Sequence, residues 1–438
     1  MIEPIGLNGE LAVLRKGGNI MKTVLNISAA LTVFLPALAS AAEIEFLCYN
    51  NGNECEVISE LAERFTAESG HVVNTNVVAY TVIRDQLLNQ LQTGDAAPDV
   101  ARVTDLGGMA QFFLDLSPYV DVSFFETEFG TMLPWMRPEG DTKGIYGLPG
   151  STVTGPFVNV TMFEDAGVEI PGAGATWDEW VTALTAVKET LGLDAAFALD
   201  RTGHRFGGPA FSYGARFFND AGEPILVDDG FRTFAETFVD WHKSGFMPES
   251  GWPAGSSTQY RNAAPLFMNE EVAMHFAGSW MIKNYDSNIS NFEWKAVPVP
   301  CGEGGCGAMV GGAAITGFKS TKHPEAVAAF IDFLARPEIA REYYAKSLNI
   351  PAHATIQKEG VEYVGASARV AEALNVFGDN ALKAATTTPQ AFVFQGYPKN
   401  FVIFGSIPEY MTKAITGEMT LDEALSAMDA DIAAKIAE

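Results

Sequence analysis

The chain has 438 residues, with 54 acidic and 28 basic side chains and a formal net charge of −26 at pH 7. This acidity argues against nucleic acid, an anionic membrane surface or a polyanionic substrate as the main partner. The length is sufficient for two lobes with separate hydrophobic cores.

The N-terminal region has the pattern of a secretory signal peptide. Met21 and Lys22 begin a stretch in which residues 24–38 are almost wholly apolar, and residues 39–41 close it with an A-x-A pattern. The apolar core is too short to span a membrane. We therefore predict that residues 1–41 are an upstream extension and a cleaved signal peptide, with Met21 as the true initiator. The alternative is an uncleaved N-terminal anchor.

Strands and helices alternate along the next part of the chain. We predict strands at residues 43–49, 71–78 and 99–103, and helices at residues 54–69, 81–92 and from 109–113 onward. This alternation indicates a parallel sheet that is covered by helices. Ligands gather beyond the C-terminal strand ends of such sheets. The pattern therefore places Tyr49, Asn50, Asn51, Thr104 and Asp105 at one edge of a cleft.

The remaining chain indicates a second lobe and several crossings between the lobes. We predict crossings at residues 145–154, at Gly311-Gly312 and near residues 360–375, because each interrupts the pattern of regular elements. The elements predicted between and after them are helices opening at Thr176, at 226–245, at Pro324, at Pro337 and at Leu421, and strands at 274–276 and 296–299. We therefore predict that residues 42–150 with 313–365 form lobe 1 and that residues 151–312 with 366–438 form lobe 2, joined by a multi-segment hinge.

Five short motifs follow one another between residues 266 and 352. They are Ala273-Met274, Gly278-Ser279-Trp280, Gly311-Gly312, Lys322-His323-Pro324-Glu325-Ala326 and Ile350-Pro351-Ala352. In this order they resemble the sugar-binding proteins of bacterial ABC importers, the extracellular solute-binding family that includes maltose-binding protein. The resemblance implies the two-lobe α/β periplasmic binding protein fold of type II, with a helix-covered, mainly parallel sheet in each lobe. It also implies a monomer that closes on a carbohydrate and delivers it to an inner-membrane ABC permease.

Sugar recognition needs flat apolar surfaces for the faces of a pyranose ring and planar polar groups for its hydroxyls. Trp280 is the first candidate because it follows a glycine at a strand tip, and its alternative role is a core residue that caps the strand. Asp105 stands where the family often places a hydroxyl-binding carboxylate, and its alternative role is a helix N-cap. Asn50 and Asn51 are alternatively turn residues. The predicted ligand-binding residues are Tyr49, Asn50, Asn51, Asp105, Thr152, Tyr213, Trp280, Gly311 and Gly312.

Two observations leave the identity of the ligand open. The maltose-binding pattern has an acidic–basic pair in the first loop, whereas this chain has asparagine and glycine at residues 50–53, which argues against maltose itself. Arg201, Arg205 and Arg216 are unusual in so acidic a chain. If one of them faces the cleft, the ligand carries a carboxylate or a phosphate; the alternative is pairing with surface carboxylates. A polyol, a sugar acid or a phosphorylated polyol is therefore the alternative ligand. Trp252 and Tyr397 are further aromatic candidates in loops.

The four cysteines fall into two close pairs, Cys48 with Cys55 and Cys301 with Cys306. In an oxidising periplasm, two local disulfides are the favoured interpretation. Free thiols are one alternative. A zinc site is the other, although neither pair has the C-x₂-C spacing that such sites favour.

The chain lacks the sequence motifs of a P-loop, an H-E-x-x-H zinc protease and a G-x-S-x-G nucleophile elbow. We therefore predict a binding protein without catalytic residues, cofactor or metal. No lipobox cysteine follows the cleavage site and no later segment is apolar enough to span a membrane, so we expect it to diffuse freely in the periplasm. The alternative functions are a carboxylate-dependent glycosidase and a partner of a sensor or chemoreceptor.

Overall fold

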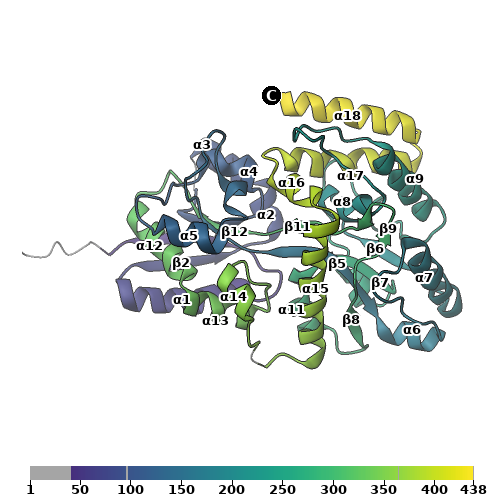
Figure 1. Cartoon of the computed structure of the whole chain (residues 1–438), viewed down its shortest axis with the longest axis horizontal. Coiled ribbons are helices and arrows are strands. Elements are labelled where there is room, and N and C mark those ends of the chain that lie inside the picture. The colour runs from purple at the N-terminus through teal and green to yellow at the C-terminus, as the bar shows by residue number, and fades with distance from the viewer. Residues whose placement is uncertain (1–40, 95–96, 364, 438) are drawn as a thin grey trace, which may run out of the picture. The chain divides into compact units, whose positions relative to one another are not determined.

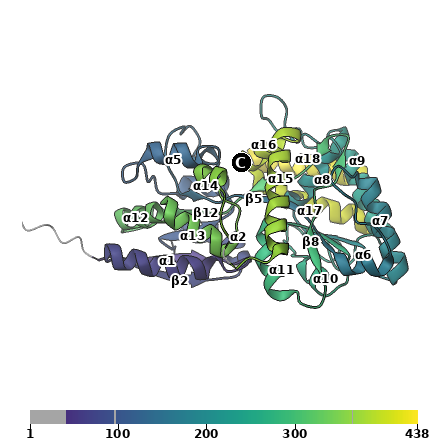
Figure 2. The ribbon, with the colours of Figure 1, turned by 60° about the horizontal axis from the view of Figure 1, so that its bottom comes forward.

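Two five-stranded sheets organise the part of the chain that the structure, a computed structural model, describes: residues 41–94, 97–363 and 365–437. Apart from Ala41, the predicted signal peptide lies outside these residues. Helices cover both sheets, as Figures 1 and 2 show. This arrangement confirms the predicted α/β class.

The first sheet has the strand order β2-β1-β3-β12-β4. Its strands are β1 (Glu43–Cys48), β2 (Val72–Val77), β3 (Val100–Val103), β4 (Leu148–Pro149) and β12 (Ala314–Gly317). Strands β1, β2 and β3 run parallel, as predicted, and β12 runs antiparallel to β3 and β4. Parallel strands are joined by helical crossovers, so the carboxyl ends of β1, β2 and β3 meet at one edge of the sheet.

The second sheet has the strand order β11-β5-β7-β6, and β8 also pairs with β5. Its strands are β5 (Thr152–Asn159), β6 (Phe197–Leu199), β7 (Met274–Gly278), β8 (Trp294–Ala296) and β11 (Val310–Gly311). The prediction of mainly parallel strands is wrong for this sheet. The long central strand β5 runs antiparallel to β7, β8 and β11, and only β6 and β7 are parallel.

One group of helices packs around the first sheet (Figure 1). It comprises α1 (Glu54–Ser69), α2 (Tyr80–Asp85), α3 (Leu87–Thr93), α4 (Leu106–Met109), α5 (Val122–Phe129), α12 (Pro324–Ala335), α13 (Pro337–Ser347) and α14 (Ala354–Glu359), with the 3-10 turns η1 (Ala110–Phe112) and η2 (Leu133–Met136). The single helix predicted at residues 81–92 is two helices, because Gln86 leaves the helical conformation at φ −121°. The helix predicted from 109–113 begins earlier, at Leu106, and continues as η1.

A second group of helices packs around the second sheet (Figure 2). It comprises α6 (Val160–Ala166), α7 (Trp177–Leu191), α8 (Gly203–Ser212), α9 (Asp229–Lys243), α10 (Ala264–Met268), α11 (Ile282–Asn288), α15 (Ala368–Thr387), α16 (Gln390–Gly396), α17 (Asn400–Thr416) and α18 (Leu421–Ala437), with the 3-10 turn η3 (Ser279–Met281). The helix predicted to open at Thr176 is α7, and it begins with a capping box in which Thr176 and Glu179 exchange hydrogen bonds.

The chain passes between the sheets at three places. It leaves the first sheet after β4 to enter β5, returns from β11 to β12, and passes between α14 and α15 from one group of helices to the other. The first two passages are hydrogen-bonded, because Gly150 N donates to Ala313 O at 2.8 Å. A Cβ atom on Gly312 would lie 1.8 Å from the carbonyl oxygen of Gly150, so only glycine permits this close approach. The domain boundaries drawn from the sequence stay a prediction.

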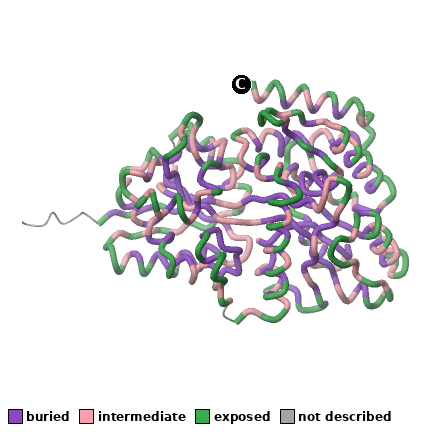
Figure 3. The backbone as a smooth tube through the Cα atoms, viewed as in Figure 1, coloured by how far each residue is buried: buried purple, intermediate pink, exposed green. Residues whose placement is uncertain are grey.

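The core follows the alternation of apolar side chains along the strands. In β1 the side chains of Ile44, Phe46 and Cys48 are buried, while Glu43 and Glu45 are exposed. The strands β3, β6 and β7 are buried along their whole length, as Figure 3 shows for the centre of each sheet. Burial on both faces is what helices on both sides of a sheet require.

Both predicted disulfides are present. The bridge between Cys48 and Cys55 joins the end of β1 to the first turn of α1, and both cysteines are fully buried. The bridge between Cys301 and Cys306 closes a small hairpin formed by β9 (Cys301–Gly302) and β10 (Gly305–Cys306).

The described residues contain neither a candidate membrane span nor a candidate metal site. No helix in residues 41–94, 97–363 and 365–437 is long and apolar enough to cross a membrane. Within the same residues, no three side chains of histidine, cysteine, aspartate or glutamate gather as a metal site.

Candidate functional site

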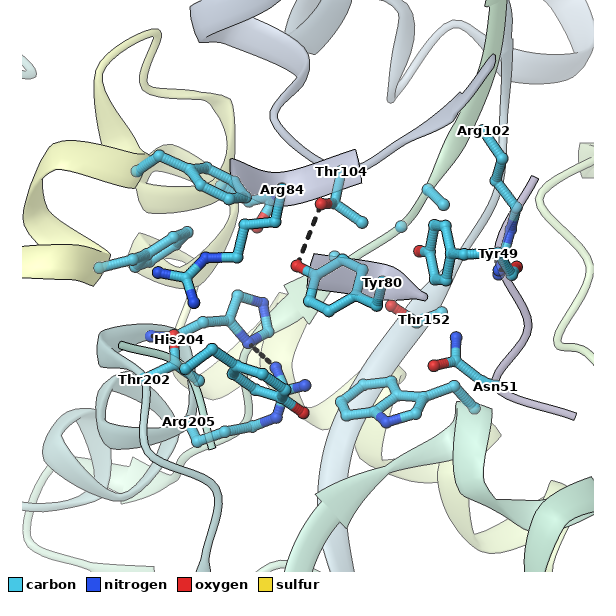
Figure 4. A pocket seen from close by; sticks show the side chains of 18 residues that line it. Tyr49, Asn51, Tyr80, Arg84, Arg102, Thr104, Thr152, Thr202, His204 and Arg205 are labelled. Atoms are coloured by element: carbon cyan, nitrogen blue, oxygen red, sulfur yellow. Dashed lines mark hydrogen bonds between the residues drawn. The ribbon is translucent and has the colours of Figure 1, made fainter. Parts of the chain in front are cut away.

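Residues from both sheets and from the C-terminal helices line one pocket, which we call the central pocket (Figure 4). It contains about 830 Å³ of empty space, a figure that includes open solvent at its mouth. Its lining consists of Tyr49, Asn51, Tyr80, Arg84, Arg102, Thr104, Thr152, Thr202, His204, Arg205, Tyr260, Trp280, Gly311, Gly312, Ala313, Gln395, Phe401 and Phe404.

The first wall of the central pocket stands at the carboxyl edge of the first sheet. Tyr49 follows β1, Tyr80 opens α2 just beyond β2, and Thr104 follows β3. The rings of Tyr49 and Tyr80 pack with centroids 5.0 Å apart, and the Tyr80 hydroxyl lies 3.1 Å from Thr104 Oγ1. The parallel strand order therefore brings three side chains from distant parts of the sequence to one surface.

A buried ion pair holds this wall from behind. Arg102 stacks on the Tyr49 ring at 4.2 Å, donates to the Tyr49 carbonyl at 2.7 Å and pairs with Glu54 at 3.3 Å. The other Glu54 oxygen accepts the backbone N–H groups of Asn51 and Gly52. Burial opposes the charged form of Arg102, but Tyr49 and Glu54 outweigh it and raise the arginine pKa. The loop that presents Asn51 is thus fixed by a carboxylate in the first turn of α1.

The second wall carries the indole of Trp280. Trp280 lies in η3, directly beyond the end of β7. A Cβ atom on Gly278 would lie 2.0 Å from Trp280 Cζ3, so residue 278 must be glycine for the indole to fold back over the strand end. This glycine makes room for the ring of Trp280 itself.

Arg205 supports the other part of this wall. Its guanidinium stacks on Trp280 at 4.1 Å, and its Nε lies 3.3 Å from Asp200 Oδ2. Asp200 also accepts from the Tyr260 hydroxyl at 3.3 Å, from Ala263 N at 2.8 Å and from His275 Nε2 at 3.0 Å. Burial alone would raise the pKa of Asp200, but these donors, His275 first, hold it at about 2. Asp200 therefore stays ionised and fixes both Arg205 and Tyr260.

His204 is neutral in this setting. Burial lowers its pKa to about 3, with a further contribution from the charge of Arg205. Its Nδ1 lies 2.7 Å from Arg205 Nη1 and its Nε2 lies 3.3 Å from the Val310 carbonyl. Since the arginine can only donate, Nδ1 is the acceptor and Nε2–H donates to Val310. His204 thus orients Arg205.

Two hydrogen bonds join the walls. Arg84, one helical turn after Tyr80 in α2, donates through Nη2 to the Thr258 carbonyl at 2.9 Å. Asn284 of α11 donates to the Asn51 carbonyl at 3.3 Å. Figure 4 shows Arg84, Thr202, His204 and Arg205 along one side of the central pocket, opposite Tyr49, Asn51 and Thr152.

Six of the nine predicted ligand-binding residues line the central pocket. They are Tyr49, Asn51, Thr152, Trp280, Gly311 and Gly312. Asn50, Asp105 and Tyr213 do not. Asn50 binds Glu56 and the Cys55 N–H as a turn residue, and Asp105 accepts from Gly108 N as the N-cap of α4.

Tyr213 packs on the core residue Phe234, at a centroid distance of 5.2 Å. Of the three predicted arginines, Arg205 lines the pocket, Arg216 pairs with Asp220 at the surface, and Arg201 is buried. Trp252 is a core residue whose indole donates to Leu199 O, and Tyr397 packs on Phe218.

Several residues of the central pocket were not predicted from the sequence. Tyr80 follows the end of β2 just as Tyr49 follows β1, so the strand-end rule that selected Tyr49 would have found it. Thr202, His204 and Arg205 follow β6, a strand of three residues that was not predicted. Gln395, Phe401 and Phe404 belong to α16 and α17, whose sequences show no pattern that indicates a ligand.

Comparisons with known proteins agree with this geometry. The family model described as bacterial extracellular solute-binding protein matches residues 51–341. No curated protein sequence matches the chain.

Among solved structures, an ABC substrate-binding protein from Listeria monocytogenes in complex with cycloalternan has a TM-score of 0.74 and 18% identity, covering 91% of this chain and 99% of that one. The GacH receptor of Streptomyces glaucescens, solved unliganded and with acarbose, has a TM-score of 0.72 and 22% identity over 89% and 97% of the two chains. Maltose-bound MalE3 of T. maritima has a TM-score of 0.72 and 18% identity over 90% and 99%. At these identities the likeness shows the fold.

Proposed function

The chain belongs to the family of bacterial extracellular solute-binding proteins, and on that premise we propose that it captures a carbohydrate in the central pocket and delivers it to an ABC permease. The observation that carries the proposal is the combination of aromatic and polar side chains from both sheets around one pocket. The rings of Trp280, Tyr260, Tyr49 and Tyr80 line the pocket together with threonine hydroxyls and amide groups, and Tyr260 packs edge to face on Tyr80 at 5.6 Å between ring centroids. Stacked rings and planar polar groups are what pyranose recognition needs.

The structural neighbours that were solved with cycloalternan, acarbose and maltose support the choice of a carbohydrate. The predicted set of Tyr49, Asn51, Thr152, Trp280, Gly311 and Gly312 forms the ligand contacts in this proposal. A ligand that touches both walls favours a closed population over an open one, because it gains contacts with both only when they are close. The three chain passages between the sheets serve as the hinge.

The proposal includes the cellular setting. A cleaved signal peptide takes the chain to the periplasm, where it works as a monomer beside its permease, without a membrane anchor.

We do not propose a catalytic function for the central pocket. A glycosidase needs two carboxyl groups flanking the scissile bond, and the described residues that line the central pocket include no aspartate or glutamate.

The test is a thermal-shift screen of the mature chain against monosaccharides and oligosaccharides, followed by calorimetry on each compound that stabilises it. Trp280→Ala removes the largest ring from the pocket, so we expect the affinity for the best compound to fall about 10- to 100-fold. The matched control is Tyr119→Ala, which removes an aromatic ring that is 43% exposed and does not line the pocket.

Two results would contradict the proposal. One is a screen in which no carbohydrate raises the melting temperature of the mature chain. The other is a bound carbohydrate whose affinity is the same in Trp280→Ala as in the unchanged chain, because the ligand would then bind elsewhere.

A further inference from the structure

We propose that the captured carbohydrate carries an anionic group, a carboxylate or a phosphate, which Arg84 and Arg205 bind. This inference rests on the proposed function, because it narrows the ligand class of the same pocket.

The charges around the central pocket oppose those of the whole chain. The formal net charge is −26, yet the pocket lining contains three arginines and, among the described residues, no aspartate or glutamate. Glu54 and Asp200 lie behind this lining and pair with Arg102 and Arg205, whereas Arg84 has no buried carboxylate partner among the described residues. The uncompensated positive charge of the lining therefore lies at Arg84, where an anionic group of a ligand would balance it.

The three arginines differ in how far their hydrogen-bond donors are already used. Arg102 is committed to Glu54 and to the Tyr49 carbonyl, so its charge is balanced inside the wall. Arg205 uses Nε for Asp200 and Nη1 for His204, while its Nη2 has no hydrogen-bond partner among the described residues. Arg84 uses Nη2 for Thr258, and its Nη1 likewise has none in residues 41–94, 97–363 and 365–437. Arg84 and Arg205 each keep a donor for a ligand.

The positive charge on the Arg84 side is poorly balanced. The nearest carboxylate to Arg84 is Asp85, at 3.7 Å, whose side chain is 56% exposed and therefore well screened by water. Behind the wall, the buried Arg201 donates to the carbonyls of Trp252, Gln259, Ser257 and Pro408 rather than to a carboxylate. Burial, together with the neighbouring charges of Arg261 and Arg84, lowers the pKa of Arg201 to about 10, and Glu409 only partly opposes this. An anion in the pocket would offset this repulsion.

The neutral polar groups of the pocket indicate that the ligand also carries hydroxyls. Gln395 is 5% exposed and lines the pocket, and its Oε1 has no hydrogen-bond partner among the described residues. A buried acceptor without a donor is unfavourable, because it has lost its hydrogen bonds to water and gained none in return. A ligand hydroxyl would satisfy it. A neutral sugar brings many hydroxyl donors to a pocket without carboxylate acceptors, whereas a sugar acid or sugar phosphate brings acceptors to the arginines and a few hydroxyls to Gln395.

The experiment uses matched sets of compounds on the mature chain: glucose, glucuronate and glucose 6-phosphate; galactose, galacturonate and galactose 1-phosphate; glycerol and glycerol 3-phosphate. Inorganic phosphate and acetate control for the anion alone. We expect at least one anionic compound to bind at least about 10-fold more tightly than its neutral counterpart, with an affinity that falls as salt is raised. Binding of the uronates alone identifies a carboxylate, and binding of the phosphates alone identifies a phosphate.

Arg84→Gln tests the assignment to a residue. It keeps a polar side chain at a position near the surface, and we expect the affinity for the anionic compound to fall about 10-fold or more while that of the neutral counterpart changes less than about twofold. Arg216→Gln, an exposed arginine away from the pocket, is the matched control and leaves both affinities unchanged. Arg205→Gln is the second variant, with the melting temperature measured alongside because Arg205 also pairs with Asp200.

Three outcomes overturn the inference. Equal or tighter binding of the neutral members shows that the ligand is uncharged, and the proposed function then stands without it. Equal losses of affinity for the neutral and the anionic ligand in Arg84→Gln show that Arg84 does not bind the anionic group. If neither these compounds nor the sugars of the wider screen bind, the proposed function fails and this inference fails with it.

Discussion

The two walls of the central pocket contain the same arrangement of side chains in different surroundings. In each, an arginine stacks on an aromatic ring and pairs with a buried carboxylate: Arg102 on Tyr49 with Glu54, and Arg205 on Trp280 with Asp200. Glu54 otherwise binds only the neighbouring loop, through the N–H groups of Asn51 and Gly52. Asp200 instead joins two further segments, residues 260–263 through Tyr260 and Ala263, and β7 through His275. Apart from its ion pair with Arg102, Glu54 makes only local contacts among the described residues, whereas Asp200 also binds residues 60 to 75 positions along the chain, so the same substitution has different costs in each wall.

The largest expected effect is on stability, at the carboxylate of the second wall. Asp200→Asn leaves Arg205 without its charge partner and turns an amide N–H toward groups that donate, so we expect the free energy of unfolding to fall by about 3–5 kcal/mol. Glu54→Gln keeps an oxygen for the Asn51 and Gly52 N–H groups, and we expect a loss of about 1–3 kcal/mol. Urea denaturation at pH 7 measures both, with the exposed Asp240→Asn as control.

The pH dependence of stability tests the same difference between the two walls. The pKa of Asp200 is lowered from 3.8 to about 2. Its stabilisation is therefore complete above pH 4 and is lost as the pH falls toward 2, so the difference between the unchanged chain and Asp200→Asn should shrink over that range. A loss in Glu54→Gln equal to or larger than that in Asp200→Asn would contradict the contrast between the walls.

The next largest effects are expected from removing each of the two disulfides. Replacing Cys48 and Cys55 by alanine should lower stability by about 2–3 kcal/mol, the loop-closure contribution for so short a loop. Because this bridge flanks Tyr49 and the loop that presents Asn51, ligand affinity should fall as well. Replacing Cys301 and Cys306 removes a loop of similar length in a hairpin that does not line the central pocket, so it is the matched control. Calorimetry that finds the same affinity in both double variants would show that the first bridge does not shape the wall.

The difference between local and long-range contacts also explains what could be predicted from the sequence. Tyr49, Asn51 and the Cys48–Cys55 bridge follow from a strand, a turn and a helix that are adjacent in the chain, and each of these has a local pattern. The partnership of Asp200 with His275, 75 residues later, has no local pattern, and the short strand β6 that carries Asp200 to its place was not predicted. The same holds for Gln395, which reaches the pocket only because α16 packs beside β11.

A substitution of Asp105 has the smallest expected effect. This residue also shows that not every residue that follows a strand end lines the central pocket. It follows β3 as Tyr49 follows β1, yet its carboxylate caps α4 instead of lining the central pocket. Burial raises its pKa to about 6, only partly opposed by the hydrogen bond from Gly108. Asn caps a helix as well as Asp does. We therefore expect Asp105→Asn to raise stability by about 1–2 kcal/mol at pH 8, where the carboxylate is charged.

The sign of this effect follows from linkage. A raised pKa means that the folded chain holds the proton more tightly, so stability is complete below pH 4 and falls as the pH rises through 6. The gain in Asp105→Asn should therefore be large at pH 8 and absent at pH 4, as measured by melting temperature. An equal gain at both values would show that the carboxylate charge is not its cause.

The bridge between Cys48 and Cys55 has a consequence for the timing of maturation. Disulfides form in oxidising compartments and stay reduced in the cytosol. A newly made chain therefore carries two thiols next to Tyr49, and the loop before α1 is held by hydrogen bonds alone. Under the proposed export to the periplasm, oxidation completes the first wall only after the chain has left the cytosol, so we expect its full affinity for a ligand to appear where that ligand is collected.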